Sequence, residues 1–433
     1  MTQDNPAETV PAVSAKGPIL EIANSDSPGS VWGLLGSTAT LYAAFGLIYG
    51  LMQGGLPPLM RARGIDLASI GWAFLMLIPF GLTFLWAPVV DAFRPIRSAP
   101  RIGWIVPMQG VIVGALLIVA QGEAFPPAVL LGLGILVAFA AATMDVALDA
   151  LSTASVPGEH RTTAGGLKVA ALALGAILGG GVFVATAGQL GWTATFQICA
   201  AVSALATLPI LINRGWDRAG ERPRNQRPDV LAMVRQPIMR RRMGLLTLAT
   251  CSMVALAFFN RIMLVDLGVQ VETIGWIVGT GAPLCGLLAS LLAIPIVRGR
   301  GSAVGIIVFA ALCLLAASAM FIGVWREEAT PALIGAIIMN AGTSGFFVIL
   351  SATTLGWAQG TQPATDYAVL YGASRLVATV LLIALANIVA RIGWPTFYVC
   401  ASLALVASTL LLRRALPDLR ASGQSGKKSA PTT

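Results

Sequence analysis

The sequence predicts an all-α polytopic membrane protein with 12 transmembrane helices in two six-helix bundles. Three observations lead to this fold class. Of the 433 residues, 56% are apolar and only 11% are charged, whereas soluble domains carry about 25% charged residues. The apolar residues gather in twelve stretches long enough to cross a bilayer. The longest polar connection follows the sixth stretch, and the composition as a whole excludes a water-soluble enzyme.

Each expected span meets the length that a membrane requires, which is about 20 mainly apolar residues for a helix. Short segments that contain polar residues, Gly or Pro separate neighbouring spans. The spans expected in the first half of the chain are residues 33–53, 68–90, 102–121, 127–151, 165–188 and 192–213. Those expected in the second half are residues 243–265, 273–297, 302–325, 331–357, 366–390 and 394–412.

The polar segments divide the chain into five parts. Residues 1–30 lack the cationic segment that begins a signal peptide, so we expect a disordered cytoplasmic tail there, and residues 415–433 are expected to form a second one. The connection 214–242 is rich in Arg and Pro. We expect it to be a cytoplasmic linker between a bundle of residues 31–213 and a bundle of residues 243–414.

The basic residues indicate the orientation in the membrane. With an even number of spans both termini lie on one side, and that side holds 21 of the 28 Lys and Arg residues. The opposite side holds Arg61, Arg63, Arg326 and Arg391. Because cytoplasmic loops carry the excess of Lys and Arg, we expect both termini in the cytoplasm. The net charge of +9 is therefore a sign of topology, and no nucleic-acid partner is expected.

Two six-helix bundles around a long central linker are typical of transporters that bind a solute between the bundles, midway across the membrane. The 47 glycines, among them Gly175 and Gly179, allow the helices to pack closely. The chain has no enzyme motif, so no enzyme activity is expected, and the absence of a Walker A sequence argues against ATP hydrolysis. Scattered cysteines and a single histidine favour the absence of a metal site or cofactor.

Asp145 and Asp149 are the most informative charges of the fourth span. A charge at the centre of a membrane helix costs about 2.5–3.5 kcal/mol, so it needs a partner or a watery cavity. The i, i+4 spacing places both carboxylates on one helix face, and two like charges this close favour protonation of one of them. The pair is expected either to form a gate near the cytoplasmic end, with Lys168 or the loop of Arg161, or to couple transport to protons.

Three further charged residues lie near the same end. Lys168, in the first turn of the fifth span, either extends to the membrane surface or forms a salt bridge with Asp145 or Asp149. Asp91 and Arg94, at the end of the second span, are expected to form part of a latch in the loop on the inner face.

Arg375 is the main candidate for binding an anionic substrate. It lies nine residues after Asp366, or about 14 Å along the eleventh helix. At this depth the side chain cannot easily reach the membrane surface. The alternative is a structural salt bridge to Asp145 or Asp149 across the two halves.

The seventh span carries a second pair of candidates, Asn260 and Arg261, near its outer end. Arg261 would meet an anionic substrate if this span lines the cavity, and the alternative is an ion pair with Asp266. Two uncharged polar residues inside spans, Gln53 and Asn340, are also expected to face a cavity, although hydrogen bonds between helices explain most residues of this kind.

Three segments share motifs with a known family. Phe84–Asp91 (FLWAPVVD) ends the second span, Met144–Ala150 (MDVALDA) and Pro157–Arg161 (PGEHR) end the fourth, and Thr365–Leu370 (TDYAVL) opens the eleventh. Together they resemble the branch of the major facilitator superfamily that contains the muropeptide (AmpG-type) permeases and the acetyl-CoA transporters. The resemblance covers most of the N-terminal half and less of the C-terminal half.

The resemblance implies a small-molecule transporter of the bacterial inner membrane that works by alternating access and is driven by protons. Compact members of the branch, of the RhtX/FptX type, import ferric siderophores, whereas the muropeptide permeases are longer. Thr83 replaces a Lys and Met144 a Gln of the branch, and these departures favour a ferric siderophore over a muropeptide. A muropeptide is one alternative, and an assembly factor that does not transport is another. We expect a monomer surrounded by membrane lipid.

Overall fold

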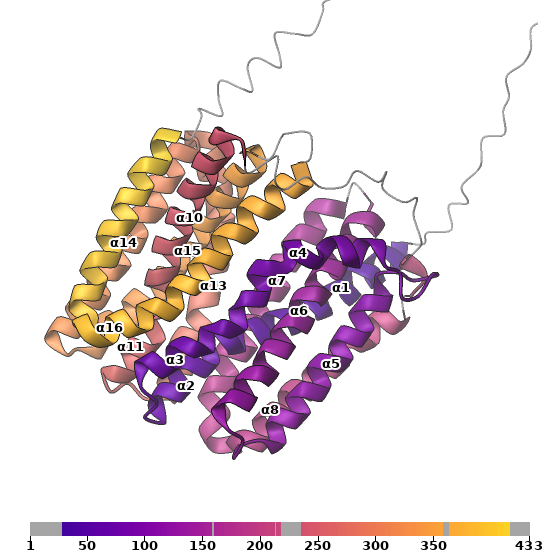
Figure 1. Cartoon of the computed structure of the whole chain (residues 1–433), viewed down its shortest axis with the longest axis horizontal. Coiled ribbons are helices and arrows are strands. Elements are labelled where there is room, and N and C mark those ends of the chain that lie inside the picture. The colour runs from indigo at the N-terminus through magenta and orange to yellow at the C-terminus, as the bar shows by residue number, and fades with distance from the viewer. Residues whose placement is uncertain (1–27, 158–159, 213, 218–234, 358–362, 416–433) are drawn as a thin grey trace, which may run out of the picture.

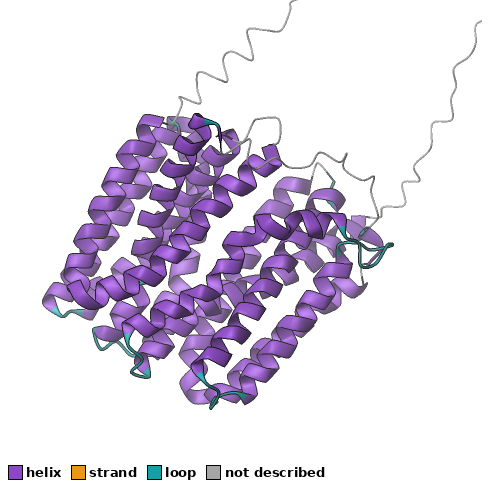
Figure 2. Cartoon of the chain, viewed as in Figure 1, coloured by secondary structure: helices purple, strands orange, loops and turns teal. Residues whose placement is uncertain are grey.

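The computed structural model describes residues 28–157, 160–212, 214–217, 235–357 and 363–415. Within these residues the secondary structure is helical and contains no strand (Figure 2). Most of the two predicted tails and much of the predicted linker lie outside the described residues, as does the side chain of Asp91.

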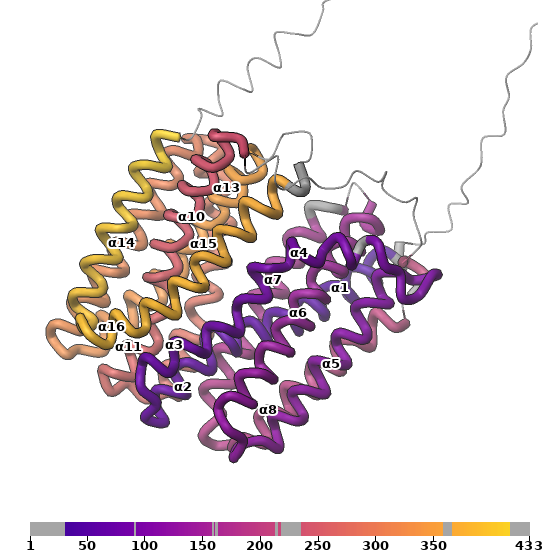
Figure 3. The backbone as a smooth tube through the Cα atoms, viewed as in Figure 1, coloured from indigo at the N-terminus to yellow at the C-terminus, as the bar shows by residue number. Residues whose placement is uncertain are grey.

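Ten helical stretches of the described chain are long and apolar enough to cross a membrane. Two of them, Thr163–Ile212 and Asp366–Ala415, have 50 residues each, which is about 75 Å and more than twice the hydrocarbon core. Each contains a glycine with left-handed backbone, Gly191 and Gly393, both at φ 74°. The orange and yellow parts of α16 accordingly run back to the same end (Figures 1 and 3). Division at these glycines gives twelve crossing segments, as predicted.

The crossings of the N-terminal half are built from eleven elements. They are α1 (Pro28–Gly50), η1 (Leu51–Gly55), α2 (Leu56–Ala62), α3 (Leu67–Ala73), η2 (Phe74–Leu77), α4 (Ile78–Ala92), α5 (Ile102–Gln121), α6 (Pro127–Ser155) and, for the last two crossings together, α7 (Arg161–Ile177) with η4 (Leu178–Val182) and α8 (Phe183–Ile212). Those of the C-terminal half are α10 (Pro237–Phe258), α11 (Asn260–Asp266), α12 (Val271–Thr273), η6 (Ile274–Gly279), α13 (Thr280–Arg300), α14 (Ser302–Arg326), α15 (Ala329–Trp357) and α16 (Pro363–Ala415).

The two halves form two helical bundles that lie side by side (Figure 1). They meet where α3 and α4 pack on α16, and where α7 packs on α13. The described chain begins and ends at the end of the molecule drawn at the top of Figure 1. We call this the near end, and we call the opposite one, which contains the α2–α3 and α11–α12 turns, the far end.

The first crossing is longer than predicted, because the helix continues past Gln53 to Ala62. It passes through Pro57 and Pro58, neither of which has a backbone N–H to donate. The preceding turn, Leu51–Gly55, is π-helical. Such local widening allows a membrane helix to tolerate proline. The apolar length of the sequence does not reveal this adjustment.

Two turns at the far end, one in each half, have similar sequences. Residues 64–72 read GIDLASIGW and residues 268–276 read GVQVETIGW. Each begins with a glycine in the left-handed region, Gly64 at φ 82° and Gly268 at φ 77°, where other residues would be strained. The chain therefore contains two similar far-end turns, about 200 residues apart. This repeat was not predicted from the sequence.

The second glycine of each repeated turn packs against the opposite half. A Cβ at Gly71 would lie 2.7 Å from the Cβ of Ala386 on α16, and one at Gly275 would lie 2.5 Å from the backbone N of Ala185 on α8. These distances are too short for a real side chain. The far end of each bundle thus contacts its neighbour through a glycine at an equivalent position.

Glycine also brings α1 and α7 together, as the sequence predicts. A Cβ at Gly50 on α1 would lie 2.7 Å from the Cα of Ala176. A Cβ at Gly175 on α7, or at Gly179 on η4, would overlap backbone atoms of α1, those of Ala43 and Leu47 respectively. The two backbones are therefore in direct contact, which is how small residues stabilise membrane bundles.

We expect Gly175→Ala to destabilise the protein, because the new methyl group forces α1 and α7 apart. Overpacking of this kind costs about 1–3 kcal/mol, and a lower thermal unfolding midpoint in detergent would report it. The matched control is Gly114→Ala, where a Cβ would meet no atom within 4 Å. Equal midpoints for the two variants would contradict the close packing of α1 on α7.

Candidate functional site

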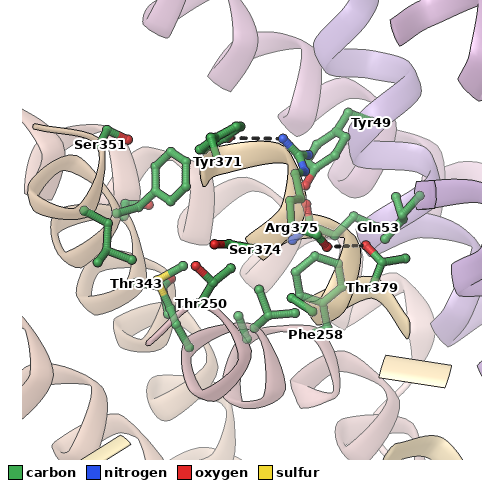
Figure 4. A pocket seen from close by; sticks show the side chains of 18 of the residues that line it. Tyr49, Gln53, Thr250, Phe258, Thr343, Ser351, Tyr371, Ser374, Arg375 and Thr379 are labelled. Atoms are coloured by element: carbon green, nitrogen blue, oxygen red, sulfur yellow. Dashed lines mark hydrogen bonds between the residues drawn. The ribbon is translucent and has the colours of Figure 1, made fainter. Parts of the chain in front are cut away.

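A cavity of about 450 Å³ lies between the two halves (Figure 4). Its volume is in the range of small-molecule binding sites, which is about 300–1,000 Å³. Helices α1 and α7 line it from the N-terminal half, and α10, α15 and α16 line it from the C-terminal half. The lining extends to Thr354, which lies three residues before the near end of α15, so the cavity reaches toward the near end.

Arg375, on α16, is the only charged side chain among the described residues that line this cavity. Its Nη1 donates a hydrogen bond to the hydroxyl of Tyr371, at 3.2 Å (Figure 4). The guanidinium carbon lies 5.2 Å from the ring centre of Tyr49 and 5.8 Å from that of Phe80. Aromatic faces attract a cation but do not neutralise its charge.

The predicted alternative for Arg375, a salt bridge to Asp145 or Asp149, is not formed. Among the described residues no carboxylate forms an ion pair with it, although the charge of Asp145 acts on it from a greater distance. A guanidinium inside the membrane without a counter-ion is costly. Arg375 is therefore available to bind an anion in the cavity.

Hydroxyl groups of the C-terminal half surround Arg375. Thr343, Ser374 and Thr379 each donate to a carbonyl one turn earlier on their own helix, at 2.8–3.0 Å. A hydroxyl that donates in this way still offers its oxygen lone pairs as acceptors. Thr250 and Ser351 add two more hydroxyls to the lining (Figure 4). This wall can accept hydrogen bonds from N–H and O–H groups of a solute.

The opposite wall is mainly apolar. Among the described lining residues of the N-terminal half, only two have polar side chains, the hydroxyl of Tyr49 and the amide of Gln53. The described lining residues from this half are Phe45, Gly46, Tyr49, Gln53, Leu77, Leu172, Ala173 and Ala176. The cavity is therefore chemically asymmetric, with its charge and most of its polar groups on the C-terminal half.

Two of the polar residues predicted to face a cavity do so. Gln53 and Asn340 both line it, and the Oδ1 of Asn340 accepts a hydrogen bond from Ser344 Oγ at 3.2 Å. Asn260 is buried at the start of α11, with 8% of its surface exposed, and is not part of the lining.

The acidic pair of α6 forms a separate cluster in the N-terminal half. Lys168 Nζ lies 2.5 Å from Asp149 Oδ1 and 3.9 Å from Asp145 Oδ1, so the predicted salt bridge is present. The hydroxyl of Tyr42, on α1, donates to Asp149 Oδ1 at 2.6 Å and lies 3.2 Å from the Oγ of Ser152. The Lys168 ammonium lies 4.7 Å from the centre of the Tyr42 ring. The cluster thus joins α1, α6 and α7 through charges that remain partly exposed.

One of our two interpretations expected Arg261 to pair with Asp266, and the other expected it to line the cavity. Neither is correct, because Arg261 forms no ion pair with Asp266 and does not line the cavity. Its Nη1 donates to the backbone carbonyl oxygens of Gly54, at 2.8 Å, and Gly180, at 2.5 Å. Asp266 is occupied by Arg61, whose Nε lies 2.5 Å from Asp266 Oδ1. Polar contacts between the halves are therefore concentrated at the far end.

Four positions that the sequence connected with function are not among the described residues that line the cavity. Asp91 and Arg94 belong to the near end of α4 and the loop after it. Met144 is fully buried among other apolar residues of the N-terminal half, and Thr83 is not among the described residues that line the cavity. Because positions 83 and 144 do not face it, their identities do not discriminate between solutes bound there.

Sequence reasoning missed most of the hydroxyl and aromatic lining. Thr343, Ser351 and Thr354 are separated by eight and three residues, a spacing that places them on one helix face. Tyr371 precedes Arg375 by four residues and so lies on the same face. These spacings are visible in the sequence. That the faces border a cavity depends on how each helix is rotated, which the sequence does not show.

Comparisons with known proteins agree with this architecture. The family described as "Major Facilitator Superfamily" matches residues 38–260. The crystal structure of a bacterial homologue of the human lysosomal transporter Spinster, in an inward-facing and unoccupied conformation, superposes with a TM-score of 0.64. It covers 90% of this chain and 98% of that one at 15% identity, so this likeness shows the fold alone.

Curated relatives match about a third of the chain. The anhydromuropeptide permease of Escherichia coli is 31% identical over 163 residues, which is 37% of this chain and 33% of the permease. An uncharacterized protein of Haemophilus influenzae is 27% identical over 156 residues, or 35% of this chain and 36% of that protein. The matched part thus spans about a third of the length of these relatives.

Proposed function

The chain belongs to the major facilitator superfamily, and from this membership and the cavity we propose that it imports an anionic organic solute across the bacterial inner membrane by alternating access. Arg375 would bind the anionic group of the solute. The single observation that supports this role is the absence of a carboxylate partner for Arg375 among the described residues. A solute anion would supply the missing counter-charge inside a site of low dielectric constant.

The solute that we propose first is a muropeptide. The E. coli relative is an anhydromuropeptide permease. A muropeptide has carboxylates that can bind Arg375, and its hydroxyl and peptide N–H groups can donate hydrogen bonds to the hydroxyl-rich wall. Gln53 and Asn340, which line the cavity, would add contacts to its polar groups.

A ferric siderophore is the second candidate. The apolar wall of the N-terminal half and the single cation suit a partly apolar anion of this kind. The chelating oxygens of a ferric siderophore bind the iron, however, so it presents fewer N–H and O–H donors to the opposite wall. This difference in donors is the reason for placing it second.

The cluster of Asp145, Asp149 and Lys168 would couple the conformational change to protons. Protonation of one carboxylate would weaken its attraction to Lys168, the lysine shared by the two acids. Since the hydroxyl of Tyr42 on α1 donates to the carboxylate of Asp149, such a change would reach the helix that also lines the cavity.

Both termini would lie in the cytoplasm, so the cavity would face inward in this conformation.

Uptake by cells or proteoliposomes tests the proposed function directly. We expect accumulation of a labelled anhydromuropeptide in cells that lack their own permease, and a weaker or absent response to a panel of labelled ferric siderophores. Accumulation of a siderophore alone would replace the first candidate by the second. A protein that reconstitutes in folded form and accumulates neither solute would favour a non-transporting role, such as membrane assembly.

Arg375→Ala should lower the apparent affinity for the transported solute. Loss of a charge-assisted hydrogen bond costs about 1.5–3 kcal/mol, which corresponds to a 10-fold to 150-fold increase in KM for uptake. Arg375→Lys retains the charge and is expected to restore part of the affinity. The control is Arg326→Ala, at an exposed position at the far end. Normal kinetics for both Arg375 variants would exclude this residue from the binding site.

Asp149→Asn should make uptake insensitive to a pH gradient. The substitution keeps the shape of the side chain and an oxygen for Tyr42 but removes the charge that pairs with Lys168. We expect solute exchange without a gradient to persist while accumulation driven by the gradient falls at least tenfold. Uptake that retains its full dependence on the gradient would leave the cluster with a gating or structural role only.

A further inference from the structure

We infer that Arg261 is the positioning residue that holds the far end closed, and that its release from the carbonyls of Gly54 and Gly180 is required before the cavity can open there. This inference rests on the proposed transport by alternating access. Arg261 lies on α11 in the C-terminal half, and both of its acceptors lie in π-helical turns of the N-terminal half, η1 and η4. One guanidinium therefore joins three crossings across the boundary between the halves.

The carbonyl of Gly54 lacks the donor that a regular α-helix would supply. In an α-helix it would accept from the residue four positions later, which is Pro58, and proline has no N–H. A carbonyl inside a membrane that accepts no hydrogen bond is strongly unfavourable. Nη1 of Arg261 supplies the hydrogen bond at 2.8 Å. The proline pair of the first crossing thus creates an acceptor that the opposite half satisfies.

Glycine makes room for the guanidinium. A Cβ at position 54 would overlap Nη1 of Arg261, and one at position 180 would lie 3.1 Å from the same atom. Next to it, a Cβ at Gly181 would lie 2.8 Å from the backbone of Gly279 on η6. The backbones of the two halves are therefore in contact beside the arginine, and larger residues at these positions would separate them.

The charge of Arg261 makes the closed arrangement selective. Among the described residues it has no carboxylate partner, so the two carbonyl dipoles are its identified ligands. A buried cation that loses its ligands is strongly destabilised. Opening of the far end removes both ligands at once, so Arg261 favours the closed state until water or an anion replaces them.

The other polar contact at the far end is more exposed. Arg61 and Asp266 retain 28% and 21% of their side-chain surface, and the indole of Trp394 donates to the second oxygen of Asp266 at 2.9 Å. Exposed ion pairs contribute little to stability. We therefore assign the main role in closure to Arg261 and a minor one to this pair.

The test measures the far-end distance between spin labels at Glu123→Cys and Glu327→Cys, in full-length protein whose five native cysteines are replaced. Both positions are exposed, one in each half. Arg261→Gln removes the charge. Gly54→Ala keeps the charge, but the added methyl group occupies the position of Nη1 of Arg261. Each is expected to increase the population with a long distance at least threefold. Arg61→Gln should change it by less than twofold, and Gly114→Ala should not change it.

The outcomes separate this inference from the proposed function, because the measurement needs no solute. Distances in both variants that equal those of the unsubstituted protein would overturn the role of Arg261, even if uptake is observed. A shift in Arg261→Gln without a shift in Gly54→Ala would also overturn it, because the hydrogen bonds from Arg261 to the backbone carbonyls would then not matter for closure. A shift in both variants of a protein that shows no uptake would support the closure and leave the proposed solute wrong. If Arg261→Gln does not fold, Arg261→Lys provides the same comparison, since an ammonium cannot reproduce the planar guanidinium.

Discussion

A charge inside a membrane must find partners, and the interior of this molecule is organised around that requirement. Three basic residues of the described crossings contact groups inside the bundles, and each meets the requirement differently. Lys168 pairs with carboxylates, and Arg261 donates to backbone carbonyls. Arg375 has aromatic rings and a tyrosine hydroxyl but no counter-ion among the described residues. The first two sites are complete without a solute, and the third becomes complete when an anion binds.

The repeated structure of the chain explains why closure and binding occur in different places. The two far-end turns have similar sequences, and a glycine of each, Gly71 or Gly275, packs against the opposite bundle. Such equivalence allows both bundles to contribute alike to closure. The Asp149–Lys168 ion pair and the Arg375 site are each single, and they lie in different halves. Chemistry is therefore divided between halves that are similar in architecture.

Much of the fold could be predicted from the sequence, because membrane spans depend mainly on local apolar length. The twelve crossings followed from apolar length, and the ion pair of Lys168 was one of the two alternatives that the sequence left open. The partners of Arg261 did not, because they are backbone atoms, exposed by Pro58 and by glycines that a side-chain pattern does not identify. The hydroxyl-rich wall was also missed. Which residues form it depends on how α15 and α16 are rotated relative to α1, a helix far away in the sequence.

The uneven walls of the cavity have a consequence for the transport cycle. A solute whose anion and hydrogen-bond donors are held by α15 and α16 remains attached to the C-terminal bundle when the two bundles rock past each other. Any difference in affinity between the two sides of the membrane must then arise from the N-terminal bundle, which offers mainly apolar and aromatic surface. Release would therefore depend on how well that surface excludes water, rather than on a change in the ionic contact itself.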